Sequence, residues 1–382
     1  MFGQRILEMP LIEPGESKEA QQQNGENAEA VIPTVQPAQI SLAAVGDIIL
    51  NGSVVDSGIT DSGGYNFTPL FSHVSSEIGS YDLRVANQET NIPGDGFGYG
   101  SWDVLNAPQE LGHAEVEAGF NVILRANDHV MDNGAEGLHN ELNWWNSAHG
   151  NVPILGVSDP TVEESVASNG YANDVYVFEK DGFKVALLNH TWDVEEDERR
   201  FISALDEQKI ASDVQRARDA GAEMIVAFPH WGDENNSEVT EEQTSFATAY
   251  VNNGVNVIIG THPRVLQRAE ILHGENGNEA VCFYSLGCFT SSLNMENFVG
   301  GLAEVTLSRD ETGKCSVTSA VLRPVVTRRA NRGEYSTYLL ADYTDELGQT
   351  GWDYLMPDTA AQTCIDILGE GYNEEQKELR LV

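Results

Sequence analysis

The sequence predicts an α/β domain of layered sheets and helices over residues 40–327. From Ser41 onward, apolar runs typical of buried strands alternate with segments of helical periodicity, which is the pattern of α/β proteins. Many of these segments end at a glycine, as expected for short turns between elements. The stretch 280–327 is rich in strand-forming residues, so we expect antiparallel strands to be mixed in.

The first half of the domain contains a series of expected strands separated by helices. The apolar runs of these strands lie at 41–50, 80–89, 120–129 and 152–157. A helix over 106–119 should end at Gly119, and a helix over 136–148 has large apolar residues on one face. This order of elements supports the α/β class.

The second half begins with an expected hairpin over 175–190 that turns at Asp181-Gly182. Helices are expected over 207–221 and 241–254, and each ends at a glycine. Further strands are expected at 223–232, 255–263, 281–289, 302–310 and 314–325, with a turn at 311–313 joining the last two.

The two ends of the chain differ in composition from the domain. Residues 14–39 are rich in Gln, Asn, Glu, Ala and Pro, so we expect a flexible tether over 1–39. Residues 328–382 are expected to form a C-terminal extension with one helix near 359–368. The sequence contains no apolar run of about 18 residues, the length that a membrane span needs. Its first residues lack the apolar core of a signal peptide.

The composition excludes one class of partner. The chain has 21 Lys+Arg against 60 Asp+Glu, a formal net charge of −39, which excludes nucleic acid and disfavours anionic membrane surfaces. Four scattered cysteines without a CxxC pair predict buried free thiols rather than a disulfide scaffold or a structural zinc site, with one disulfide as the alternative.

Residues able to bind a cation or move a proton follow five of the apolar runs. These candidates are Asp47, Glu89, Asn127-Asp128-His129, His230 and His262. Because ligands of α/β sheets bind beyond the carboxyl ends of strands, we expect the five loops to converge on one edge. The mixed oxygen and nitrogen donors suit manganese, iron or zinc better than calcium. Taken singly, each residue has an ordinary alternative, such as a turn cap, a solvated carboxylate or a core histidine.

These motifs resemble the poly-gamma-glutamate capsule biosynthesis protein (CapA) family, a branch of the metallophosphatase-like superfamily. The matching pieces span about Ser41 to Thr290 and read AAVGDIIL, ANQET, AGFNVILRANDHVMDNGAEGL, PILGV, HWGDE, TEEQTSFATAYVNNGVNVIIGTHPRVLQRAEI and FYSLGCF. The resemblance implies a four-layer α/β/β/α sandwich of the metallophosphatase (calcineurin-like phosphoesterase) type, with one or two divalent metal ions. It also implies a location outside the cell or at its surface, with 1–39 as the stalk of a missing N-terminal anchor.

The resemblance assigns roles to the positions that match it, whereas the role of Arg264 is expected from the charge of its guanidinium. The implied metal ligands are Asp47, Glu89, Asp128, His230 and His262. We expect His129 and Arg264 to be the catalytic residues, and Asn87, Asn127 and Arg264 to bind substrate.

Four positions depart from the family pattern. Thr261 and Arg264 replace the first and last histidines of its Gly-His-His-Pro-His motif, and Cys288 replaces the asparagine of Ser-Leu-Gly-Asn-Phe. Asp128 stands where the family usually has asparagine, and its charge partly compensates for the lost imidazoles. Arg264 brings a fixed cation suited to a carboxylate or phosphate.

Two functions follow as hypotheses. In the first, the metal activates water for attack on a phosphoryl or acyl centre, His129 is the general acid, and Arg264 stabilises developing negative charge. In the second, the protein is a non-catalytic accessory or polymer-binding protein on the same fold; a purely structural secreted domain is a third alternative. The expected partners are an anionic surface polymer such as poly-gamma-glutamate and a capsule-synthesis membrane complex. With a net charge of −39, the chain must meet such a polymer locally, at the metal and Arg264.

Overall fold

The computed structural model describes residues 35–100, 104–160 and 175–382, and their strands form two sheets. Most of the expected tether, 1–34, lies outside the described residues. Its last residues belong to the fold, because the first strand already begins at Ala38.

The first sheet has ten strands, ordered β15-β16-β13-β12-β1-β2-β3-β4, with β11 beside β1 and β14 beside β13. The strands are β1 (Ala38–Ile48), β2 (Leu83–Gln88), β3 (Val122–Leu124), β4 (Ile154–Leu155), β11 (Cys288–Thr290), β12 (Val299–Arg309), β13 (Cys315–Arg329), β14 (Tyr335–Leu339), β15 (Tyr372–Asn373) and β16 (Glu378–Arg380). The strands β1 to β4 are parallel, whereas β12 pairs with β1 and β13 in antiparallel fashion. The expected mixture of strand directions is therefore present.

The second sheet has six strands in the order β5-β6-β7-β8-β10-β9. They are β5 (Tyr176–Lys180), β6 (Phe183–Thr191), β7 (Met224–His230), β8 (Val257–Ile259), β9 (Ala269–His273) and β10 (Glu279–Phe283). The predicted hairpin is β5 and β6, and Asp181 and Gly182 both adopt positive φ in its turn. The strands β6, β7 and β8 are parallel, so their carboxyl ends lie at one edge.

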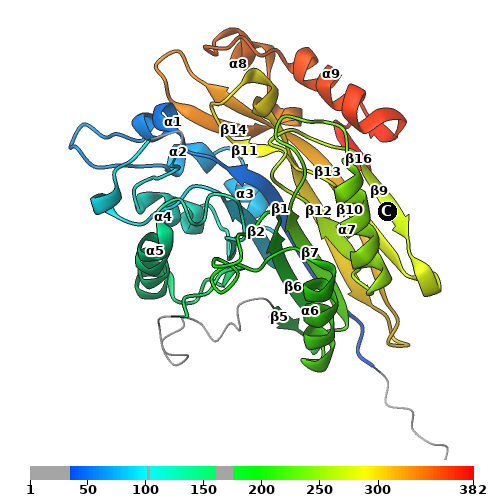
Figure 1. Cartoon of the computed structure of the whole chain (residues 1–382). Coiled ribbons are helices and arrows are strands. Elements are labelled where there is room, and N and C mark those ends of the chain that lie inside the picture. Colours follow the sequence, from blue (N-terminus) through cyan, green and yellow to red (C-terminus); the bar gives the residue numbers. More distant parts are fainter. Residues whose placement is uncertain (1–34, 101–103, 161–174) are drawn as a thin grey trace, which may run out of the picture. The chain divides into compact units, whose positions relative to one another are not determined.

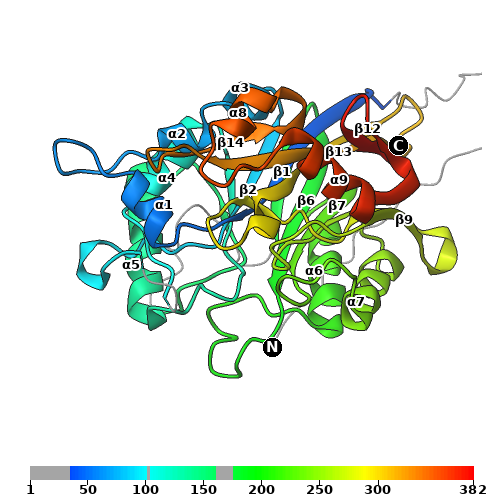
Figure 2. The same cartoon turned by 90° about the horizontal axis from the view of Figure 1, so that it is seen from above.

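Alternating side chains of the strands separate three apolar layers. In β1, Ile40, Leu42 and Ala44 join the core between the two sheets, together with side chains of β6, β7 and β8. Ala43 and Val45 point the other way, into the core beneath the helices of the first sheet. The outer face of the second sheet packs against α6 and α7 in a further core. This arrangement, seen in Figures 1 and 2, confirms the predicted α/β/β/α sandwich.

The longer helices match the predictions, whereas the short ones were not predicted. The helices are α1 (Gly52–Ser57), α2 (Thr68–Phe71), α3 (Ser75–Ile78), α4 (Glu110–Glu117), α5 (Gly134–His149), α6 (Glu207–Asp219), α7 (Glu241–Asn252), α8 (Asp345–Gln349) and α9 (Pro357–Leu368). The N-terminus of α7 is fixed by a capping box between Thr240 and Gln243. Asp206 caps α6 by accepting a hydrogen bond from the backbone N of Lys209.

The single strand expected at 281–289 is wrong, because this segment supplies strands to both sheets. It leaves the second sheet after β10 and enters the first sheet as β11, beside β1. Gly287, with φ of 62°, lies at the crossing, and its carbonyl accepts a hydrogen bond from the backbone N of Asp47 (3.0 Å). The pattern misleads because both halves of the segment are buried.

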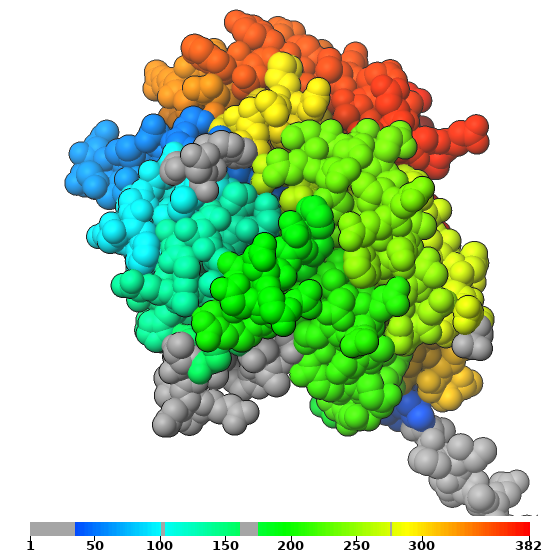
Figure 3. Space-filling model, in the orientation of Figure 1, coloured from blue at the N-terminus to red at the C-terminus, as the bar shows by residue number. Residues whose placement is uncertain are grey.

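The residues after 327 are part of the first sheet rather than an appendage to it. The strand β13 runs through the expected boundary to Arg329, and β14 and β16 both pair with it. Side chains of α9, including Ala360 and Cys364, join the core between the sheets. In Figure 3 these orange and red residues lie against the yellow segment near 295.

All four cysteines are free thiols, as predicted, and the alternative of one disulfide is excluded in this structure. Three of them are buried, whereas Cys315 is only half-buried, because it lies at the start of β13.

Candidate metal centre

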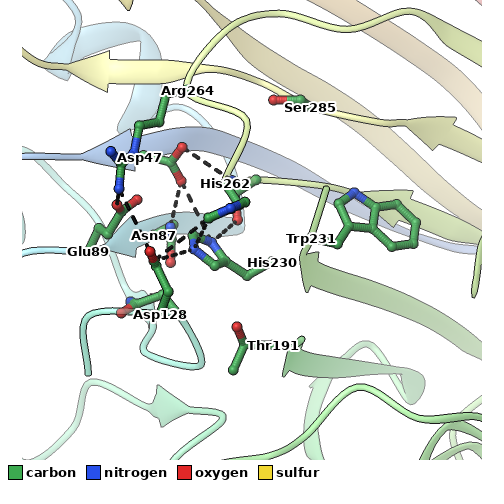
Figure 4. Close-up of polar contacts among 12 residues, drawn as sticks. Asp47, Asn87, Glu89, Asp128, Thr191, His230, Trp231, His262, Arg264 and Ser285 are labelled. Carbon is green, nitrogen blue, oxygen red and sulfur yellow. Dashed lines mark hydrogen bonds and ion pairs between the residues drawn. The ribbon is translucent and has the colours of Figure 1, made fainter. Parts of the chain in front are cut away.

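The candidate residues lie where the carboxyl ends of strands from both sheets meet. Asp47 is near the end of β1, and Asn87 lies in β2, with Glu89 directly after it. Asp128 follows β3 in the same sheet, while His230 ends β7 in the other. Figure 4 shows these side chains, and His262 after β8, pointing toward one another. The structure thus brings the five predicted metal ligands together, and the strand topology is the reason.

Asp47 is fully buried, and its carboxylate accepts two hydrogen bonds. Asn87 donates from Nδ2 to Asp47 Oδ1 (2.7 Å), and the backbone N of His262 donates to Oδ2 (3.3 Å). The preceding Gly46 allows the backbone to pass close to the 284–287 segment, since a Cβ there would lie 1.8 Å from the carbonyl oxygen of Gly287. Glycine at position 46 is therefore required where these two segments of the chain cross.

Asp128, His230 and His262 form a compact group. Asp128 Oδ1 lies 2.9 Å from His230 Nε2 and 3.7 Å from His262 Nδ1, and the two ring nitrogens are 3.2 Å apart. The other nitrogen of His230, Nδ1, lies 2.9 Å from Thr261 Oγ1. A hydroxyl that accepts the Nδ1 proton leaves Nε2 as the atom that can bind a metal.

The donor set fits a divalent cation. The described residues contain three groups whose ligand atoms lie within 4.8 Å of one another: Asp128, His230 and His262; Asp47, Glu89 and His230; and Glu89, Asp128 and His129. Buried oxygens of Glu89 (Oε2), Asn87 (Oδ1) and Asn127 (Oδ1) have no hydrogen-bond partner among the described residues. Because an unpaired buried oxygen is costly, these atoms indicate a site built for a positive ligand.

The electrostatics of the cluster point the same way. Burial raises the pKa of Glu89 well above its usual value, and the charge of Asp47 adds to this, while Arg264 opposes it. Burial lowers the pKa of His230, so that its ring is neutral, the form that binds metals. Although burial raises the pKa of Asp128, its contacts with the His230 and His262 rings outweigh burial and hold that pKa well below the usual range. A cation would relieve the repulsion between these carboxylates.

Arg264 is almost fully buried and lies among acidic groups. Its Nη2 is 3.1 Å from Glu89 Oε1, 2.9 Å from Glu234 Oε1 and 3.7 Å from Asp128 Oδ2. The same nitrogen lies 3.2 Å from His129 Nε2. The predicted catalytic pair is therefore in direct contact.

His129 is oriented by a carboxylate on the opposite side of its ring. Its Nδ1 lies 2.9 Å from Asp132 Oδ2, which leaves Nε2 facing Arg264. Burial lowers the pKa of His129, but the hydrogen bond to Asp132 and the charge of Asp128 outweigh burial and raise it.

The loop after β8 is strained at two residues of the cluster. His262 has φ of 97° and Arg264 has φ of 63°, a region that side chains other than glycine rarely adopt. The backbone carbonyl of Arg264 accepts a hydrogen bond from Asn297 Nδ2 (3.0 Å), which helps to hold this conformation. Strain of this kind costs about 1–3 kcal/mol per residue and is typical of functional sites.

A polar pocket of about 430 Å³ opens beside Arg264 and Glu234. Its other lining residues are Asn51, Gly52, Gly100, Asn235, Leu293 and Asn294. Asp128 and His129 are the partly exposed members of the cluster, with 30% and 15% of their side chains accessible. A ligand can therefore reach the cluster from the side of these residues.

Two predicted substrate-binding residues are buried instead. Asn87 is fully buried and bonds Asp47, whereas Asn127 donates from Nδ2 to the carbonyl of Gln88 (3.0 Å). In this structure both asparagines bond protein groups and expose almost nothing to a substrate.

Three neighbours of the cluster were not given a role from the sequence. Thr261 orients His230, Asp132 orients His129, and the ring of Trp192 packs edge-on against His262, with centroids 5.7 Å apart. Trp192 directly follows β6, so a search for every side chain just beyond a strand end could have found it. The partners of Thr261 and Asp132 become clear only from the folded chain.

Comparison with known proteins identifies relatives over most of the domain. Residues 41–292 match the family described as bacterial capsule synthesis protein PGA_cap. The chain is 27% identical over 278 residues to the capsule biosynthesis protein CapA of Bacillus anthracis, a match that covers 69% of this chain and 63% of that protein. It therefore spans less than two thirds of the length of that relative.

Two further proteins are similar to this chain. The chain is 26% identical over 298 residues to the PGA biosynthesis protein CapA of Bacillus subtilis (strain 168), covering 75% of this chain and 73% of that protein. Among solved structures, it is similar to the calcineurin-like phosphoesterase YfkN from Bacillus subtilis, with a TM-score of 0.43 and 14% identity. That match covers 87% of this chain and 97% of the other.

Proposed function

The chain belongs to the bacterial capsule synthesis protein PGA_cap family, and on this premise we propose that it is a metal-dependent hydrolase of surface-polymer biosynthesis. The bond cleaved would be a phosphoester or a γ-glutamyl or other acyl bond. One observation carries the proposal: a buried set of carboxylates and imidazoles, with unpaired oxygens, lies beside a polar pocket that contains a buried arginine.

Asp128, His230 and His262 are the residues best placed to hold a divalent ion, with Asp47 next to them. Mixed carboxylate and imidazole donors suit manganese, iron or zinc. Such an ion supplies Lewis acidity and lowers the pKa of water to near neutrality.

The remaining groups would act on the substrate directly. Nδ1 of His129 is bonded to Asp132, so Nε2 is the atom able to give a proton to a leaving group. Arg264, which lines the pocket, would bind a phosphate or carboxylate of the substrate and stabilise negative charge as it develops. Asn87 would orient Asp47 rather than contact the substrate.

The expected partner is an anionic surface polymer such as poly-γ-glutamate, met at the cell surface beside a capsule-synthesis membrane complex. The ground for proposing this polymer is that one Bacillus relative is named for capsule biosynthesis and the other for PGA biosynthesis. The net charge of −39 offers no long-range attraction for such a polymer, so binding would depend on Arg264 and the metal. Among the described residues, none of the helices has the length and apolar character of a membrane span.

A non-catalytic accessory or polymer-binding protein is the second candidate. The observation that favours it is the replacement of two motif histidines by Thr261 and Arg264, which reduces the number of metal donors. In that case the same pocket would bind a polymer segment without cleaving it.

Turnover separates the two candidates. Phosphoester and γ-glutamyl substrates should be tested with the protein loaded with Mn²⁺, Zn²⁺ or Mg²⁺, and we expect hydrolysis of at least one class. His129→Ala should lower kcat by about 100-fold, because the leaving group loses its proton donor. His273→Ala is the control, since His273 is exposed on β9. Metal-loaded, folded protein that cleaves neither class would support the accessory role instead.

A further inference from the structure

We propose that Arg264 stands in for a second metal ion, so that the centre holds one divalent cation, at Asp128, His230 and His262. This inference rests on the proposed metal centre and specifies how many ions it binds.

One nitrogen of Arg264 contacts every member of one candidate ligand group. Glu89, Asp128 and His129 form that group. Arg264 Nη2 lies 3.1 Å from Glu89 Oε1, 3.2 Å from His129 Nε2 and 3.7 Å from Asp128 Oδ2. The three candidate ligands therefore already face the positive charge of Arg264. Its Nη2 lies where an ion bound by all three would have to lie.

Arg264 is fixed in that position. Only 1% of its side chain is exposed, and Nη2 also lies 2.9 Å from Glu234 Oε1. Its backbone carbonyl accepts hydrogen bonds from Asn297 Nδ2 and from the backbone N of Cys288. A guanidinium held in this way occupies space and repels a second cation.

A metal can still bind at Asp128, His230 and His262, because the two carboxylate oxygens of Asp128 face different neighbours. Oδ1 faces His230 Nε2 (2.9 Å) and His262 Nδ1 (3.7 Å), whereas Oδ2 faces Arg264. The carboxylate of Asp128 thus lies between the proposed ion and the guanidinium. The carboxylate of Asp128 would therefore be shared by two positive charges, the bound ion and the guanidinium of Arg264.

The assignment makes Glu89 a partner of Arg264 rather than a ligand of the ion. Glu89 is fully buried, and burial without a positive neighbour would leave a carboxylate uncompensated. Arg264 supplies that neighbour through Glu89 Oε1. Replacing Glu89 by glutamine should therefore leave the first ion bound.

The test is the number of ions bound per chain. Full-length protein is loaded with excess Mn²⁺, desalted and analysed for metal by plasma mass spectrometry, and the wild type should retain a single ion. Arg264→His should retain a second ion, because it removes the charge and adds a donor; Arg268→His, in the following exposed segment, should retain one. In the electron paramagnetic resonance spectrum, wild type should show an isolated Mn²⁺, and Arg264→His an exchange-coupled pair.

Each other result has a distinct meaning. Two ions in the wild type, or one ion in a folded Arg264→His variant, would overturn this inference while leaving the metal centre intact. If Arg264→His does not fold, Glu89→Gln decides: retention of one ion supports the assignment, and loss of that ion overturns it. A wild type that binds no ion would overturn the proposed function together with this inference.

Discussion

Replacing His230 with alanine should lower the affinity for Zn²⁺ or Mn²⁺ by at least about 100-fold and remove turnover above background. Losing a side chain that only orients a metal ligand typically lowers metal affinity by about 10- to 100-fold. His230 is proposed as a direct ligand, so its loss should lower the affinity by at least the upper end of that range. Its Nε2 lies within 3.2 Å of both Asp128 Oδ1 and His262 Nδ1, so no neighbouring side chain can replace it without displacing these groups. Competition with a chelating dye would measure the change.

The matched control is His190, which is as fully buried as His230 and lies in the neighbouring strand β6. Its ring nitrogens face Tyr250 and Asp213 instead of the cluster. His190→Ala should therefore reduce stability but leave the metal affinity of the folded protein unchanged. Equal metal affinities for wild type and His230→Ala would show that the ion, if bound, is held elsewhere.

Replacing Gly46 with alanine should destabilise the protein by about 3 kcal/mol or more, and folded protein should be scarce. The new Cβ would lie 1.8 Å from the carbonyl oxygen of Gly287 and 2.9 Å from its carbonyl carbon. These are backbone atoms, so relief requires β1 and the 284–287 segment to separate. That movement would also break the hydrogen bond from Asp47 N to Gly287 O (3.0 Å), which positions the first carboxylate.

Gly96 provides the control for this substitution. It is exposed, and a Cβ built there meets no atom within 4 Å. Gly96→Ala should change the free energy of unfolding by no more than about 0.5 kcal/mol, measured by denaturant titration. If Gly46→Ala were as stable as Gly96→Ala, β1 and the 284–287 segment could not cross as closely as described.

The locations of the cluster residues could be predicted because strand ends are a local feature of the sequence. Each apolar run stops where its strand stops, and parallel strands place those stops at one edge. Asp47 and His230 were found in this way. The contacts among the cluster residues were not predictable, because they join distant parts of the chain. Arg264 and Glu89 are 175 residues apart, and His262 and Asp47 are 215 residues apart.

The parts of the fold that were mispredicted share one physical cause. Residues 281–289 form one apolar run, yet the two halves belong to different sheets, and hydrophobicity alone does not say which sheet buries a residue. Residues after 327 have the composition of a tail, yet β14 and β16 pair with β13. Strand pairing depends on long-range partners, which local patterns do not encode.

The most direct test of the metal centre is a crystal structure of the protein soaked in Zn²⁺, with anomalous difference density measured at the zinc edge. We expect a single peak about 2.0–2.2 Å from Asp128 Oδ1, His230 Nε2 and His262 Nδ1, with Arg264 still bound to Glu89. The absence of any peak at this edge of the sheets, at zinc concentrations that saturate the protein in solution, would contradict it.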